Sequence, residues 1–279
     1  MKLKQYIISI VFGLAFIELC LRAFDDYIGL SYFQNVKSYF DRMTQRNSYY
    51  IHPANEYYQL GNIIIKTDSC GLRTGTKNYL PDKKTLMLLG DSVVFGWGVD
   101  YDSTFSGRLG KYFNVINAGV GSWNTQSEYN WFQSKGIYLN PDIVLLIMVS
   151  NDLKPSYLKS TSLLQTIVVK SYVLSCLKYF HKCLTYNESI ENVSISIQAL
   201  KNLEILCYQN NIDLRVCLYS PIKIKQKVLE LLKAYCDDAK IPCVTMPNKC
   251  FEHRNTFIDG HLNSKGHEIL TDYLIKYLR

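Results

Sequence analysis

Five short apolar runs alternate with amphipathic segments over residues 82–279, and this alternation predicts the fold. The runs occupy residues 85–89, 113–117, 143–149, 212–219 and 243–246. Each ends in small or polar residues, as parallel strands that are buried on both faces do. The segments between them have helical spacing, for example at Leu200, Leu203 and Cys207. Strands that alternate with helices, without hairpin signals, predict an α/β fold with a three-layer, doubly wound parallel sheet.

A different pattern stands at the amino terminus, where residues 6–21 form an almost unbroken apolar stretch. Glu18 interrupts it, Arg22 follows it, and Lys2 and Lys4 precede it. Such a stretch can cross a membrane once its flanking residues snorkel, and no small-residue cleavage site follows. We therefore expect residues 1–24 to be an uncleaved signal-anchor transmembrane helix with its amino terminus in the cytoplasm. The alternative is a buried helix of a soluble protein.

These patterns divide the chain into an anchor, a connector and a main domain. Residues 25–81 are mixed, rich in Tyr and Asn, and are expected to lay a short strand and a turn against the domain formed by residues 82–279. A helical insertion is expected over about residues 153–195, with an apolar stretch at 163–180. The insertion could be a lid, a substrate wall or a membrane-surface contact.

Composition narrows the possible partners. The chain is 48% hydrophobic and 20% charged, which is typical of a folded protein, and its net charge of +7 is scattered. Without a basic stripe interleaved with aromatic residues, nucleic-acid binding is disfavoured. The nine cysteines have no metal-ligand spacing, so a zinc site is disfavoured. We expect neither another metal nor a cofactor. Cys243 and Cys250 could pair in an oxidising compartment, and the odd total leaves at least one free thiol within a single chain.

Candidate chemistry lies where the strands end. Ser92 follows the first strand in Gly90-Asp91-Ser92, at the carboxyl edge where open parallel sheets present reactive groups. Taken alone, this tripeptide also fits a capped turn. The second strand leads into a glycine-rich turn over residues 118–126 that opens a helix expected at about 125–138, and exposed N–H groups at such a helix start favour developing negative charge.

Two further segments contain the remaining candidate catalytic residues. Asn151 follows the strand at residues 143–149, where its carboxamide could donate a hydrogen bond to an oxyanion. Asp259 and His261 precede the last amphipathic helix. A neutral imidazole can take a serine proton while a carboxylate orients the ring.

In this order the segments resemble the sequence blocks of the SGNH (GDSL-like) hydrolase superfamily. The resemblance implies that the fold is the flavodoxin-like SGNH hydrolase fold. It also implies that Ser92 is the nucleophile, His261 the general base and Asp259 its orienter. The oxyanion hole would be formed by the backbone N–H groups of Ser92 and Ser122 and by the side chain of Asn151.

The match to the family has departures as well as support. Ser122 and Val149 stand where the second and third blocks have Gly, and Asp-x-His replaces the more usual Asp-x-x-His. The lead-in His52-Pro53 followed by Asp-x-x-Gly-x-Arg at residues 68–73 is similar to that of membrane-anchored members. We expect His52 and His267 to be structural.

The sequence therefore predicts a membrane-anchored, SGNH-type serine esterase whose domain lies outside the cytoplasmic membrane and acts on an acylated small molecule or glycan. An O-acyltransferase of a cell-envelope glycan would use the same triad, and a non-catalytic glycan- or partner-binding protein could keep the fold. A nucleotide binder is disfavoured because no phosphate-cradling glycine loop follows the first strand. The oligomeric state is not determined by these patterns.

Overall fold

The computed structural model describes residues 2–24, 38–46, 48–60, 62–75, 79–149, 152, 170–185, 191–219, 226–254 and 260–279. The chain divides into two compact units. The smaller contains Met1–Arg42 and Lys159–Glu188, and the larger contains Met43–Leu158 and Ser189–Arg279.

The larger unit is built on one sheet whose strands lie in the order β10-β9-β8-β6-β7-β5-β4-β3. Its parallel strands are β6 (Thr85–Gly90), β7 (Asn114–Gly119), β8 (Ile143–Met148), β9 (Asp213–Leu218) and β10 (Cys243–Thr245). These are the five strands that the apolar runs predict. Because β7 lies on one side of β6 and the later strands lie on the other, the sheet is doubly wound, as expected.

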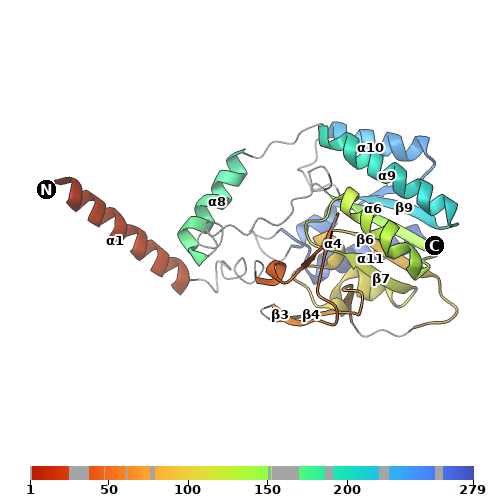
Figure 1. Ribbon diagram of the computed structural model, residues 1–279, viewed down its shortest axis with the longest axis horizontal. Coiled ribbons are helices and arrows are strands. Elements are labelled where there is room, and N and C mark those ends of the chain that lie inside the picture. Colours follow the sequence, from red (N-terminus) through yellow and green to blue (C-terminus); the bar gives the residue numbers. More distant parts are fainter. Residues whose placement is uncertain are drawn as a thin grey trace. The chain divides into compact units, whose positions relative to one another are not determined.

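Helices cover both faces of this sheet, which explains why β6 and β8 are apolar almost throughout (Figure 1). They are α4 (Ser92–Phe95), α5 (Phe105–Leu109), α6 (Thr125–Ser134), α9 (Glu191–Gln209), α10 (Gln226–Asp238) and α11 (Ser264–Leu278). On one face α5 and α11 pack together over a core that includes Leu88, Leu145 and Leu274, and on the other α6 packs against α9. Short 3-10 turns occupy Tyr101–Ser103, Gly136–Leu139 and Asn248–Glu252.

The helix expected at 125–138 ends earlier, at Ser134. Gly136 lies so close to the Trp131 ring that a Cβ atom there would come within 2.7 Å of it. Glycine is a poor helix former, and here the tight packing selects it. The chain therefore leaves the α-helix before the 3-10 turn.

The connector adds more strands than expected. β3 (Tyr57–Leu60), β4 (Ile63–Thr67) and β5 (Arg73–Thr74) extend the sheet beyond β7 in antiparallel fashion. β1 (Thr44–Gln45) and β2 (Tyr50–Ile51) form a separate small hairpin. The residue pair 61–62, Gly-Asn, between two β-rich runs is a hairpin signal that the sequence analysis overlooked.

The cysteines described by the structure are free thiols. Cys243 does not pair with Cys250 but shares a hydrogen bond with the buried thiol of Cys236, on the neighbouring α10. The disulfide considered for an oxidising compartment is therefore not formed in this structure.

The smaller unit contains two described helices, α1 (Lys2–Ala23) and α8 (Tyr172–Thr185). Residues 4–23 of α1 are long and apolar enough to cross a membrane, and none of this stretch is buried. At 1.5 Å per residue, a 20-residue stretch spans about 30 Å, the thickness of a hydrocarbon core. α8 belongs to the predicted insertion, whose residues 153–169 and 186–190 lie outside the described residues.

Candidate active site

Ser92 begins α4, directly after the carboxyl end of β6. Asp91 caps the helix by accepting a hydrogen bond from the Val93 N–H at 2.8 Å. A Cβ atom on Gly90 would lie 2.5 Å from a methyl group of Val94, so only glycine lets the helix fold back this closely. The local sequence Gly-Asp-Ser thus produces a sharp strand-to-helix turn that presents the Ser92 hydroxyl at the sheet edge.

The structure brings Ser92 and His261 together. The Nε2 atom of His261 lies 2.8 Å from Oγ of Ser92. The Oδ2 atom of Asp91 is the more distant acceptor for this hydroxyl, at 3.2 Å. A serine hydroxyl has one hydrogen to donate, so the geometry favours the imidazole as its acceptor. This is the contact that a nucleophile and its general base require.

The loop that carries His261 is held from both sides. Asn263 caps α11 by accepting hydrogen bonds from the N–H groups of Lys265 and Gly266 at 3.0 and 3.1 Å. Leu262 is buried and pairs with Arg254 in a short antiparallel bridge. These contacts fix the backbone on which the imidazole stands. Asp259, the expected orienter, lies outside the described residues.

Ser122 follows β7 in a turn that is tied to the end of β6. The Val120 N–H donates to the Gly90 carbonyl at 3.1 Å, and the Tyr50 hydroxyl donates to the Gly121 carbonyl at 2.8 Å. Ser122 has a φ of 64°, in the left-handed region that favours glycine. The serine therefore adopts a backbone conformation that glycine takes without strain. Its hydroxyl shares a hydrogen bond with the Tyr50 side chain.

The turn after β8 is organised by Asp152. Its carboxylate accepts hydrogen bonds from the Thr125 hydroxyl at 2.9 Å and from the Val149 N–H at 2.5 Å. The Ser196 hydroxyl, on α9, donates to its backbone carbonyl. Asn151, the expected oxyanion donor, is the residue before it and lies outside the described residues.

Glu128 is a buried acid that the sequence analysis missed. It is completely inaccessible, and among the described residues neither carboxyl oxygen has a hydrogen-bond partner. Burial raises its pKa well above the usual value, and the nearby Asp152 and Asp91 add to this effect. Burial also raises the pKa of Asp152 to about 8, against the lowering effect of its hydrogen bonds. Glu128 lies in the first turn of α6, where acids are common on exposed surfaces, so no local signal marks its burial.

Arg73 holds the backbone that follows the nucleophile. Its guanidinium is buried, donates to the carbonyls of Phe95, Gly96 and Val99, and lies 4.8 Å from the centre of the Phe95 ring. The His52 ring packs on the same phenyl ring, with 4.6 Å between centroids. The lead-in motif therefore acts as a clamp on the segment after α4.

The two histidines expected to be structural are both buried in packed surroundings. Burial lowers the pKa of His52 and of His267 to about 3, so both rings are neutral near pH 7. Nδ1 of His267 accepts a hydrogen bond from the Phe105 N–H at 3.3 Å, and the two rings stack at 5.6 Å. Neither ring is placed to exchange protons with solvent.

Comparisons with known proteins give structural matches alone. No family model matches the sequence, and no curated protein matches it. Among solved structures, TesA matches with a TM-score of 0.50 and 15% identity over 70% of this chain and 98% of its own. An acetyl xylan esterase, AlAXEase, matches with a TM-score of 0.50 and 13% identity over 70% of this chain and 100% of its own. At these identities the matches show a common fold. Within the described part of the chain, no cluster of His, Cys, Asp or Glu could hold a metal ion.

Proposed function

We propose that this chain, which has the SGNH hydrolase fold, is a serine ester hydrolase that forms an acyl-enzyme on Ser92. The observation that carries the proposal is the 2.8 Å separation between Oγ of Ser92 and Nε2 of His261 at the carboxyl edge of the parallel sheet. That the proteins of like fold include an acetyl xylan esterase supports an ester as the bond that is cleaved.

In the first half-reaction Oγ of Ser92 attacks the ester carbonyl carbon while Nε2 of His261 takes the hydroxyl proton. The resulting tetrahedral intermediate collapses as the C–O bond to the alcohol breaks, and the alcohol leaves with the proton held by His261. Water then repeats the sequence on the acyl-enzyme and releases the acid and free Ser92. Asp259 would orient the imidazole and stabilise its charged form.

The negative charge on the carbonyl oxygen needs donors that are already in place. The Ser92 N–H belongs to the first turn of α4, where helix geometry leaves N–H groups without intrahelical acceptors. We assign the Ser122 N–H and the Asn151 carboxamide as the other two hydrogen-bond donors of the oxyanion hole. One such donor contributes about 3–4 kcal/mol to transition-state stabilisation. The left-handed conformation of Ser122 supports this assignment, because it keeps the backbone geometry of a glycine.

The proposed site of action is the outer side of the cytoplasmic membrane. α1 would cross the bilayer once, with Lys2 and Lys4 on the cytoplasmic side, and the hydrolase domain would follow it outside. An acylated glycan or small molecule is the substrate class that fits an exposed hydrolase at an envelope surface. A sugar hydroxyl in place of water in the second half-reaction would give O-acyl transfer by the same residues.

The proposal is tested with the full-length chain in detergent. We expect it to hydrolyse p-nitrophenyl acetate and to be labelled by an activated fluorophosphonate. Ser92→Ala should abolish the label and lower kcat/KM by about 10³-fold or more. Ser69→Ala, at an exposed serine of the connector, is the matched control and should leave both unchanged.

Two results would contradict the proposal. Turnover or labelling that survives in Ser92→Ala would place the reactive nucleophile elsewhere. A folded wild-type chain with neither turnover nor label would favour the non-catalytic binding protein.

A further inference from the structure

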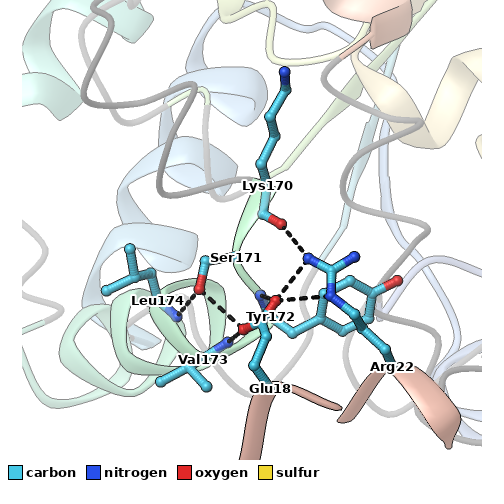
Figure 2. Close-up of polar contacts among 7 residues, drawn as sticks. All are labelled: Glu18, Arg22, Lys170, Ser171, Tyr172, Val173 and Leu174. Carbon is cyan, nitrogen blue, oxygen red and sulfur yellow. Dashed lines mark hydrogen bonds and ion pairs between the residues drawn. The ribbon is translucent and has the colours of Figure 1, made fainter. Parts of the chain in front are cut away.

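The acidic residue of α1 is engaged by a helix from the insertion. Figure 2 shows the Glu18 carboxylate at the amino terminus of α8, where it accepts hydrogen bonds from the N–H groups of Tyr172 and Val173, each at 3.0 Å. The Ser171 hydroxyl also donates to it at 3.0 Å. Glu18 is separated from these residues by more than 150 positions and nevertheless caps their helix.

Arg22, one turn further along α1, completes the junction. Its guanidinium donates to Glu18 at 2.7 and 3.0 Å and to the Lys170 carbonyl at 2.9 Å, and it lies 4.6 Å from the centre of the Tyr172 ring (Figure 2). Both charged residues in the carboxyl-terminal part of α1 are thus bound to the start of α8. The junction lies in the last two turns of α1, where the apolar stretch ends.

The rest of α8 has two unlike faces. Val173, Cys176 and Leu177 recur at helical spacing, and the sequence continues that period with Phe180 and Leu184. Lys178 lies on the opposite side of the helix and is exposed. Leu177, on the apolar side, is 59% exposed. The described residues of the smaller unit therefore leave much of this side chain uncovered.

Charge distinguishes this segment from the rest of the chain. α8 has no acidic residue, and residues 153–190 contain the five lysines Lys154, Lys159, Lys170, Lys178 and Lys182 against the single acid Glu188. An amphipathic helix with a basic polar face is the pattern that binds the surface of an anionic bilayer.

We propose that α8 lies in the headgroup layer at the outer end of α1, with the Leu177 face toward the acyl chains and Lys178 toward anionic phospholipid headgroups. The inference rests on the proposed membrane crossing of α1. The position of the junction argues for lipid as the occupant, because a helix that starts at the end of a transmembrane stretch starts at the membrane boundary. Glu18 is then a docking residue, since its carboxylate fixes α8 at that depth.

Brominated-lipid quenching of tryptophan fluorescence tests this placement. The full-length chain is reconstituted into vesicles of phosphatidylcholine and phosphatidylglycerol with brominated acyl chains. The native Trp97, Trp123 and Trp131 are buried in the larger unit, so lipid should not quench them. Leu177→Trp adds a reporter on the apolar face, and Lys178→Trp is the matched control on the polar face.

We expect emission added by Leu177→Trp to be quenched at least about twofold more than that added by Lys178→Trp. Adding Glu18→Gln to Leu177→Trp should reduce the excess quenching of this reporter over Lys178→Trp, because an amide cannot replace both accepting oxygens of the cap. Replacing phosphatidylglycerol with phosphatidylcholine should weaken the quenching as well.

Equal quenching of the two reporters in chains that resist extraction by carbonate would overturn the inference and leave the membrane crossing intact. Extraction by carbonate would instead overturn the crossing itself, and the inference with it. Cross-linking of α8 to a second copy of the chain, with the Leu177→Trp reporter unquenched, would show that protein rather than lipid covers this face. Fluorophosphonate labelling of Ser92 in the same vesicles reports on the hydrolase separately.

Discussion

Nε2 of His261 and Oγ of Ser92 lie 2.8 Å apart, although 169 positions separate the two residues in the chain. The backbone at each of the two residues is fixed by hydrogen bonds of its neighbours in the chain. Asp91 caps the helix that starts at Ser92, and Asn263 caps the helix that follows His261. Because both loops are fixed independently, the hydroxyl and the imidazole are arranged before any substrate binds.

This arrangement predicts a large and selective effect of His261→Ala. Without an acceptor for the serine proton, kcat for p-nitrophenyl acetate should fall by about 10³-fold or more while the fold persists. His253→Ala, at a half-buried histidine eleven positions before the start of the last helix, should retain turnover. Activity of His261→Ala within tenfold of the wild type would contradict the assigned role.

Ser122 should carry measurable backbone strain. A left-handed φ costs a residue with a Cβ atom about 1–2 kcal/mol, and glycine avoids this cost. Ser122→Gly and Ser122→Ala both remove the hydroxyl that contacts Tyr50, so they differ only in the Cβ atom. In urea denaturation, we expect the unfolding free energy of Ser122→Gly to exceed that of Ser122→Ala by about 1 kcal/mol. Equal stability would mean that the turn relaxes to accommodate the side chain.

The buried acids predict that stability falls as pH rises. The pKa of Asp152 is raised to about 8 and that of Glu128 well above its usual value, so the folded state holds protons that the unfolded state releases at lower pH. Their contribution is fully present below about pH 4 and is lost toward pH 8 and beyond, with a slope of up to about 1.4 kcal/mol per pH unit for each group.

Glu128→Gln tests this dependence, because the amide is similar in shape and does not ionise. The variant should lose less stability than the wild type between pH 6 and 8.5 in denaturant titrations. Glu252→Gln, at an exposed acid, should follow the wild-type curve. Parallel curves for Glu128→Gln and the wild type would show that Glu128 is not protonated in the folded state at neutral pH.

Arg73 should be irreplaceable by lysine. Its planar guanidinium reaches the carbonyls of Phe95, Gly96 and Val99 at once and also stacks on a ring, which a single ammonium group cannot do. We expect Arg73→Lys to lower the free energy of unfolding by about 2–4 kcal/mol. Arg46→Lys, at an exposed arginine, should change it by less than about 0.5 kcal/mol. An Arg73→Lys variant as stable as the wild type would show that the clamp contributes little.

The local pattern of hydrophobic and polar residues was enough to determine the parallel strands of this protein and the helices between them. The apolar runs around Leu88 and Leu145 specify strands that must be covered on both faces, and helical periods between them supply the covering helices. The same reasoning placed Ser92 at the carboxyl edge of the sheet, because chain direction alone decides which end of a parallel strand a following residue occupies.

Only the tertiary structure decided which distant groups meet. The 2.8 Å contact between Ser92 and His261, the burial of Glu128 beside Asp152, and the capping of α8 by Glu18 all join residues from different elements. The period of hydrophobic residues shows on which face of a helix or strand a residue lies. It does not show which residue of another element will contact it in the folded chain. Glu128 in a first helical turn and Glu18 in an apolar helix therefore gave no sign in the sequence of the groups they would face.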